Sequence, residues 1–267
     1  MKRICNTPTG RRTCALLLLA LSGSIPFATL CAQGSAGSSG KLEPRTIILK
    51  PTAGILAKGS FAFDVDLYQQ GGVLIGLSAG IFERFSFGVS YGGTKLLGSG
   101  TPVMNPLPGV NIRLRPVEES ESWPAIVIGF DSQGKNGFLD SLDRYLVKSP
   151  GLFAAVSKNY LLAGFFSIHG GINYSFERGD GDRDVNFYVG AEKTLGPFLS
   201  LAGEYDLALN DNSQSAIGRG RGYLSIALRA SLGSGVTIGL SVQDLLQNQR
   251  GSDGPPRSAT LEFVAGF

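Results

Sequence analysis

From residue 59 to the C-terminus, apolar and polar residues alternate along the chain with a period of two. In residues 164–177, Ile168 and Ile172 would occupy one face of an extended chain, and His169 and Asn173 the other. Strict alternation over about ten residues is the pattern of a β-strand with two different faces. It is clearest in segments 59–68, 85–92, 108–115, 164–177 and 199–210, and weaker in 72–82, 123–131, 150–158, 185–195, 222–232, 236–245 and 258–267. We therefore predict an all-β chain of about twelve antiparallel strands.

The polar faces of these segments are unusual because glycine and serine dominate them and lysine is scarce. Only 17% of the residues are charged, and 38 are glycine. A soluble sheet normally covers its exposed face with Lys and Glu, whereas a membrane barrel turns bulky apolar residues to lipid and polar ones to its lumen. Strands of about 9–11 residues also match the tilted span of a bilayer core. These features predict a transmembrane antiparallel up-and-down β-barrel.

The connections between the predicted strands alternate in length, as they do in bacterial outer-membrane barrels. Short connections fall at 83–84, 118–122, 159–163, 196–198 and 233–235, and longer polar ones at 93–107, 132–149, 178–184, 211–221 and 246–257. Only the first connection, 69–71, departs from this alternation. We expect the short turns to face the periplasm and the long loops to lie outside the cell.

The last predicted strand carries a further signal. Leu261, Phe263 and Phe267 lie on one face of the terminal segment. This resembles the C-terminal strand signature of bacterial outer-membrane barrels, which the barrel insertion machinery reads. We therefore expect a membrane-insertion signal at these residues and a location in the outer membrane of a Gram-negative-type bacterium.

The N-terminus has the order of a secretory signal peptide. Basic residues precede an apolar run at 14–21, and Ala-Thr-Leu-Cys-Ala at 28–32 offers a cleavage site. We predict a signal peptide at 1–32, an N-terminal periplasmic tether at 33–58 and the barrel at 59–267, with lipidation at Cys31 as the alternative to cleavage. Cleavage would remove all three cysteines and change the formal net charge from +3 to −1, because 20 basic and 21 acidic residues remain. That charge predicts no nucleic-acid partner.

Ten titratable residues on the polar faces are predicted to line the lumen as a polar network: Asp64, Asp66, Arg113, Arg115, His169, Glu192, Glu204, Asp206, Arg229 and Glu262. Charges enclosed in a narrow lumen must be paired, because an unpaired buried charge costs several kcal/mol. Such residues could line a pore that selects ions or small solutes. They could instead form a salt-bridged plug that holds the barrel together, and the sequence leaves both open.

His169 is the only histidine of the chain, so an enzymatic function would centre on it. A lipid-acting barrel enzyme would need His169 and a serine on the lipid-facing side, whereas the alternation points both His169 and Ser167 into the lumen. We therefore predict that the chain is not an enzyme and has no catalytic residue. We also predict no metal and no cofactor, since the acidic run 180–184 lacks the Gly and Glu that a calcium loop of its spacing requires.

Several phrases are more specific than the barrel pattern, namely PTAGILAKGSFAFDVDLY, FERFSFGVSYGG, GFDSQG, LDRYLVKSPG, SKNY, HGGINYS, EYDLALNDN and GRGRGYL. They resemble an uncharacterised group of bacterial outer-membrane β-barrels similar to the YjbH-type proteins linked to exopolysaccharide production. The resemblance covers about residues 44–267. It implies an outer-membrane barrel associated with surface polysaccharide, and it carries over no catalytic residue.

Together these features predict a porin-like, monomeric barrel that is a narrow channel or an envelope component associated with surface-polysaccharide export. The alternatives are a lipid-acting outer-membrane barrel enzyme using His169 and a purely structural barrel. The expected partners are outer-membrane lipids and lipopolysaccharide, the barrel insertion machinery, and small solutes or polysaccharide.

Overall fold

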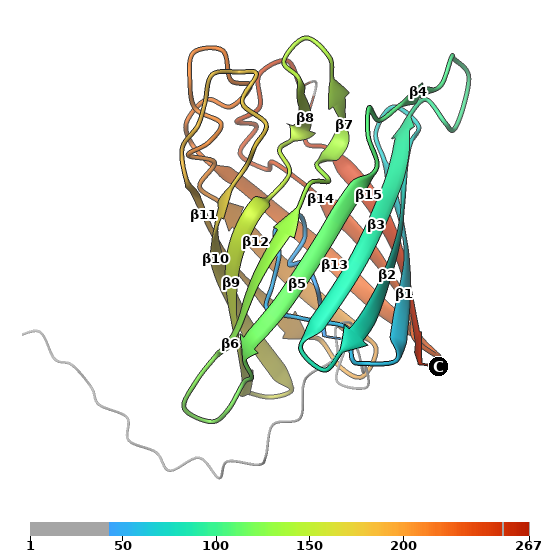
Figure 1. Cartoon of the computed structure of the whole chain (residues 1–267), viewed down its shortest axis with the longest axis vertical. Helices are drawn as coiled ribbons and strands as arrows, with labels where there is room; N and C mark the ends of the chain where they lie inside the picture. Colours follow the sequence, from blue (N-terminus) through green and yellow to red (C-terminus); the bar gives the residue numbers. More distant parts are fainter. Residues whose placement is uncertain (1–42, 253, 267) are drawn as a thin grey trace, which may run out of the picture.

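The computed structural model describes residues 43–252 and 254–266. Twelve strands form the wall of a closed barrel (Figure 1). They are β1 (Ser60–Tyr68), β2 (Gly72–Phe82), β3 (Phe85–Thr94), β5 (Gly109–Val117), β6 (Ala125–Asp131), β9 (Gly151–Leu161), β10 (Phe165–Tyr174), β11 (Asn186–Thr194), β12 (Leu199–Asp206), β13 (Tyr223–Gly233), β14 (Val236–Val242) and β15 (Arg257–Gly266). The predicted fold class and strand number are confirmed. Among the described residues, no helix has the length and apolarity needed to cross a membrane.

The barrel closes because the first wall strand pairs with the last. β1 and β15 are antiparallel and in register from Ser60 opposite Gly266 to Tyr68 opposite Ser258. Every other wall strand pairs with the wall strands that precede and follow it in the chain. Closure leaves the wall without a free edge, so its backbone hydrogen-bonding groups are satisfied inside the bilayer.

Three short strands lie outside the wall and were not predicted. β4 (Val103–Met104) pairs with the end of β3, while β7 (Lys135–Leu139) and β8 (Arg144–Val147) pair with each other. Strands of two to five residues are too short to show a clear period of two. The predicted strand 199–210 is also shorter than expected, since the chain bends after Asp206 and Ala208 has a φ of 51°.

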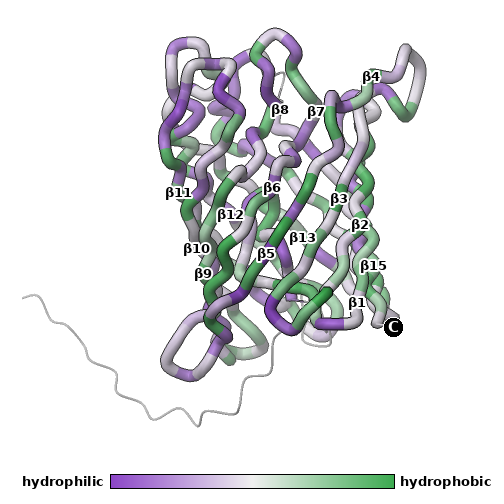
Figure 2. The backbone as a smooth tube through the Cα atoms, viewed as in Figure 1, coloured by the Kyte–Doolittle hydropathy of each residue, from purple (hydrophilic) through white to green (hydrophobic). Residues whose placement is uncertain are grey.

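The two faces of the wall differ as the alternation predicted. The outer face exposes large apolar side chains, for example Ile168 at 43% and Leu240 at 59%, whereas Ser167 and His169 on the inner face are buried. Figure 2 shows hydrophobic positions running along the strands and hydrophilic ones gathering in the loops at the top. A closed barrel with an apolar exterior and a polar interior is the architecture that spans the outer membrane. The chain is an outer-membrane barrel.

The two ends of the barrel carry different connections. The long loops lie at the top of Figure 1, and the short turns lie at the opposite end with the C-terminus. One of the bottom connections follows a bulge in β5, where the register against β6 shifts between Leu114 and Val117. Pro116 lies within this shift, which is a position where a strand tolerates proline because no ladder donor is needed. Because short turns face the periplasm in bacterial outer-membrane barrels, we assign the bottom end to the periplasm.

Residues 43–58 lie inside the barrel, where the sequence had predicted a periplasmic tether; Figure 1 shows this segment enclosed by the strands. Residues 50–56 are all buried. The segment folds inward because polar wall residues bind its backbone and its cations, as described below. The predicted signal peptide and residues 33–42 of the predicted tether lie outside the described residues.

The predicted insertion signal lies on the outer face of β15. Leu261 is 39% exposed there, and the ring of Phe263 packs edge-on against Phe61 of β1 with centroids 6.0 Å apart. Phe267 lies outside the described residues. Recognition of these residues by the insertion machinery stays a prediction.

Leu228, at the middle of β13, tests the lipid-facing assignment. It is 43% exposed on the outer face. We expect Leu228→Arg to lower the free energy of unfolding in phospholipid bilayers by about 2–4 kcal/mol, because a cation at the bilayer midplane loses its hydration. Equilibrium denaturation in vesicles measures this, with Leu228→Ala as the size control. Equal stability of the two variants would contradict a lipid-facing position.

Candidate functional site in the barrel lumen

The lumen is occupied by a short hairpin of the N-terminal segment, which we call the lumen hairpin (residues 43–58). Its turn is closed by hydrogen bonds from the amide of Ile47 to the carbonyl of Lys50, at 2.8 Å, and from the amide of Thr52 to the carbonyl of Arg45, at 3.1 Å. Thr46 and Pro51 form an isolated antiparallel bridge between the two arms. Residues 47–50 are therefore the tip of the lumen hairpin.

A single carboxylate of the wall holds this tip. One oxygen of Glu204 in β12 accepts the backbone amides of Ile48, Leu49 and Lys50, each at 2.9 Å. The ammonium of Lys50 makes an ion pair with Asp206, two residues further along the same strand face, at 2.8 Å. Glu204 and Lys50 are 2% and 3% exposed. Convergent amide donors at a turn form a binding site for an anion, and here the anion is a wall residue.

A cation of β13 binds the backbone carbonyls on the other side of the tip. Arg229 donates to the carbonyl oxygens of Thr46, at 2.9 Å, and Ile47. The same guanidinium makes an ion pair with Glu192 of β11 at 2.6 Å. Gly190 on β11 leaves the space that the Ile47 side chain fills, since a Cβ there would lie 2.8 Å from Ile47. The wall therefore binds both the donors and the acceptors of the hairpin backbone.

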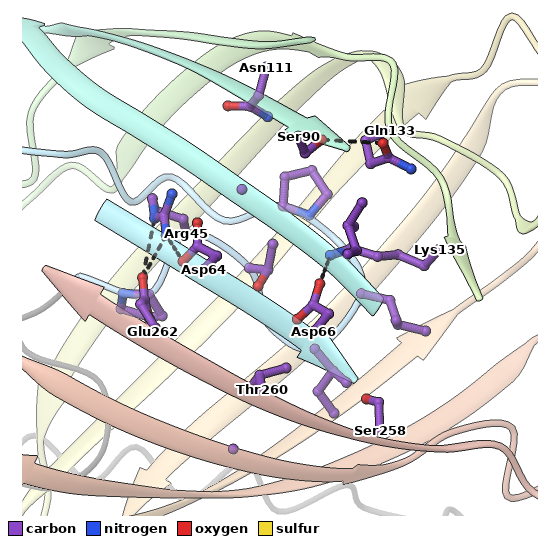
Figure 3. Close-up of a pocket in the computed structure, with 18 of the residues that line it drawn as sticks. Arg45, Asp64, Asp66, Ser90, Asn111, Gln133, Lys135, Ser258, Thr260 and Glu262 are labelled. Carbon is purple, nitrogen blue, oxygen red and sulfur yellow. Dashed lines mark hydrogen bonds and ion pairs between the residues drawn. The ribbon is translucent and has the colours of Figure 1, made fainter. Parts of the chain in front are cut away.

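Arg45, on the first arm, binds the seam of the barrel (Figure 3). Its guanidinium lies 2.6 Å from Asp64 of β1 and 2.8 Å from Glu262 of β15. Asp64 and Glu262 are direct partners in the β1–β15 register. Like charges directly opposite one another destabilise a strand pair, so Arg45 neutralises a repulsion at the closing seam.

The second arm packs on the opposite wall. Arg113 of β5 donates to the carbonyls of Thr52 and Gly54 at 3.3 and 3.2 Å. Ala53 joins a buried apolar cluster with Ala125, Val127, Phe153 and Ala155. Its amide donates to the hydroxyl of Ser157 at 2.9 Å. This arm is thus held by both apolar contact and hydrogen bonds.

The lumen hairpin is also held at the periplasmic mouth. Arg115 of β5 lies 2.5 Å from Glu43 and 2.9 Å from Glu118. Glu43 in turn accepts the amide of Ile55 at 3.2 Å, which joins the two arms. These contacts bring the start of the described chain to the wall at the base of the barrel.

All ten residues of the predicted polar network face the lumen or its mouth. Besides the contacts above, Asp66 pairs with Lys135 of β7, and Nδ1 of His169 lies 2.8 Å from the hydroxyl of Ser157. The predicted set held six carboxylates and only three arginines. Sequence reasoning missed the cations that balance them, which are Arg45, Lys50 and Lys135. The excess of carboxylates was the signal that further cations had to enter the lumen.

A polar cavity of about 180 Å³ remains beside the lumen hairpin. Arg45, Thr46 and Leu49 border it on the hairpin side, and residues of β1, β2, β3, β5, β6, β13, β14 and β15, Arg229 among them, form the wall. Figure 3 shows Asp64, Asp66 and Lys135 around this space, with Ser258 and Thr260 nearby. Neutral hydroxyl groups therefore line the cavity next to the charged pairs, since Thr260 is the register partner of Asp66.

A second buried network lies among the extracellular loops. Arg144 of β8, whose side chain is fully buried, lies 2.5 Å from Asp180 and 2.6 Å from Asp211. Lys148 lies 2.8 Å from Asp180, and Tyr223 donates to Asp211 at 2.7 Å. These contacts join three long loops over the lumen.

Asp180 and Asp182 of the acidic run 180–184 bind groups of the neighbouring loops. Asp182 accepts the backbone amides of Asn212 and Ser213 at 2.8 and 3.1 Å, and Asp180 is bound to Arg144 and Lys148 as above. In the described part of the chain, no three His, Cys, Asp or Glu side chains are grouped to hold a metal ion. The first two acidic residues of the run are therefore bound within the protein.

Comparison with known proteins adds little to this architecture. No protein-family model matches the chain, and a search of curated proteins finds no match. Among solved structures, the chain is similar to the KdgM porin, with a TM-score of 0.48 and 10% identity over 78% of this chain and 99% of that one. It is also similar to the NanC porin, with a TM-score of 0.43 and 7% identity over the same shares of 78% and 99%.

The chain is porin-like. Its closed wall, apolar exterior and polar lumen are features that porins share. None of these results supports the YjbH-type resemblance, which stays a prediction.

Glu204 tests how the lumen hairpin is held. We expect Glu204→Ala to lower the free energy of unfolding by about 3 kcal/mol, because it leaves one buried and two part-buried amides without an acceptor. Hydrogen exchange at Ile48, Leu49 and Lys50 should become faster. Glu118→Ala, at an exposed carboxylate, is the matched control and should cost about 1 kcal/mol or less. Unchanged exchange at the three amides would contradict the assignment.

The loop network predicts an acid-sensitive contribution to stability. Burial opposes ionisation of Asp180, but hydrogen bonds from Lys148, from the amide of Asp182 and from Arg144 outweigh it and hold its pKa below the ordinary value. A carboxylate with a lowered pKa stabilises the folded state above its unfolded pKa, near 4, and this contribution is lost as the pH falls through the folded pKa.

We therefore expect Asp180→Asn to lower the free energy of unfolding by about 3 kcal/mol at pH 7, since Arg144 and Lys148 would each lose a partner. The difference in melting temperature between the two proteins should shrink as the pH falls below about 4. Thermal unfolding in detergent over this pH range measures it. A difference that persists undiminished at pH 2 would rule out this carboxylate as the source.

Proposed function

We propose that the chain is a narrow channel that passes small polar solutes through the lumen cavity beside its hairpin. The observation that carries this proposal is the polar cavity of about 180 Å³ that runs between the lumen hairpin and the wall. A filled structural barrel would need no such space. Solutes would cross along the side of the lumen that the hairpin leaves open.

The lining of the cavity favours polar solutes without a strong preference for the sign of their charge. Arg45 and Lys135 are each neutralised by wall carboxylates. Next to them, on β14 and β15, the hydroxyls of Ser241 and Ser258 lie 2.7 Å apart, and the amide of Gln243 donates to both. Paired charges and neutral donors and acceptors can replace water around a small polar molecule.

A role in polysaccharide export stays a prediction, and the hairpin limits it. A polymer would need more room than a cavity of about 180 Å³ offers, so the lumen hairpin would have to leave the barrel first. Its tip is held by Glu204, Asp206 and Arg229, which makes that displacement costly. The same contacts favour the second candidate, a purely structural barrel that is permanently closed.

For the alternative of a barrel enzyme, the serine that contacts His169 is Ser157 and not Ser167. Ser157 is the hydrogen-bond partner of Nδ1, and Nε2 of His169 has no partner in the described structure. A catalytic histidine needs a third group to orient it. His169 is also 3% exposed on the inner face, away from lipid. Lipid hydrolysis by the purified chain that is lost in His169→Ala would favour the enzyme.

Single-channel recording of the refolded full chain tests the channel. We expect a small conductance with weak ion selectivity. Asp64→Asn combined with Glu262→Gln should shift the reversal potential in a KCl gradient towards anion preference, because Arg45 would then face the cavity without its carboxylates. Asp140→Asn, in an exposed loop, is the control and should leave selectivity unchanged.

The opposite outcome is equally clear. A correctly folded chain, shown by altered gel mobility without heating, that gives no conductance would contradict the channel. That result would favour the second candidate, a closed barrel with a structural role.

A further inference from the structure

The loop between β3 and β5, residues 95–108, projects away from the barrel, whereas the other long loops gather over the lumen (Figure 1). Its base is fixed to the turn between β1 and β2. The amide of Lys95 donates to the carbonyl of Gln70, and the amides of Leu96 and Leu97 donate to the carbonyl of Gly71, at 2.9 to 3.0 Å. Gly71 must lack a side chain, since a Cβ would lie 1.9 Å from the carbonyl oxygen of Leu97. The projection is therefore built into the fold.

The projecting loop exposes large apolar side chains. Leu97 is 55% exposed, Met104 44% and Leu107 72%. Three such residues within one extracellular loop are unfavourable in contact with water. Their exposure indicates that something apolar covers them.

An apolar groove of about 410 Å³ lies between this loop and the outer face of the barrel. Leu96, Met104 and Pro108 of the loop form one side, and Ile75 of β2 and Val89 of β3 are among the wall residues. Both wall residues belong to the lipid-facing surface, at 47% and 43% exposure. The groove is thus a continuation of the membrane-contacting face at its extracellular end.

The charge around the groove has one sign. Lys95 is exposed and is the only charged residue between residues 85 and 112, and residues 67–82 contain none. An unopposed lysine at the rim of an apolar groove suits a molecule with an acyl chain and a phosphate. A second copy of the chain would bring a second lysine to the same place, which disfavours it as the occupant.

We propose that this groove binds one acyl chain of a lipid of the outer leaflet whose phosphate headgroup has a net negative charge, with the phosphate on Lys95. The site goes beyond the proposed channel function and does not depend on it. The loop of residues 95–108 covers the acyl chain and holds it against β2 and β3. The lumen and its ion pairs take no part.

Quenching of a groove tryptophan tests the proposal. The full chain carrying Met104→Trp and Trp123→Phe is reconstituted in phosphatidylcholine vesicles that contain either brominated phosphatidylglycerol or brominated phosphatidylcholine. We expect the anionic lipid to associate with the groove about fivefold more strongly, as one lysine near a phosphate allows. Adding Lys95→Gln should abolish the preference.

Two further variants separate this site from general lipid contact. Leu228→Trp, on the lipid-facing side of β13, should show no preference for the anionic lipid. Leu96→Trp, at another residue that lines the groove, repeats the measurement if Met104→Trp does not fold. Equal quenching by both lipids at the groove would overturn the proposal. Absence of quenching together with a crosslinked dimer would also overturn it, because a second chain would then fill the groove.

Discussion

A barrel of twelve strands encloses more space than its inward side chains can fill, and the rest of this structure follows from how that space is occupied. The wall presents acidic side chains to the lumen, and the chain supplies its own N-terminal segment to meet them. Glu204 is central because one carboxylate oxygen accepts the three consecutive amides at the hairpin tip. Without that acceptor the hairpin backbone would lie buried with unsatisfied donors, which folded proteins avoid.

The contacts of the lumen hairpin are distributed around the wall. Charged groups bind it from β12, β13 and the β1–β15 seam, and apolar side chains bind it from β6 and β9. The cavity lies beside these contacts, and the ion pairs at the β1–β15 seam line it. The extracellular loops add a separate layer, held by Arg144 and its two aspartates.

The wall could be predicted from the sequence because successive residues of a strand point to opposite faces, so apolar and polar residues alternate with a period of two. The lumen hairpin could not, since its fold depends on backbone amides and carbonyls that leave no periodic pattern. Two signals pointed towards it. Residues 45–57 contain Ile47, Ile48, Leu49, Ile55 and Leu56, which is too apolar for a solvated tether, and the predicted lumen set had six carboxylates against three arginines. The partner of His169 was also hidden, because Ser157 and His169 meet only through the register of β9 and β10.

The position of Arg45 has a consequence for assembly. Asp64 and Glu262 face each other across the only junction of the wall that joins the two ends of the barrel chain, and Arg45 lies between them. The closed seam is therefore more stable with the lumen hairpin in place, because an empty barrel would leave the two carboxylates facing each other without a cation. The free energy of closing the wall is thus coupled to the binding of the protein's own N-terminal segment.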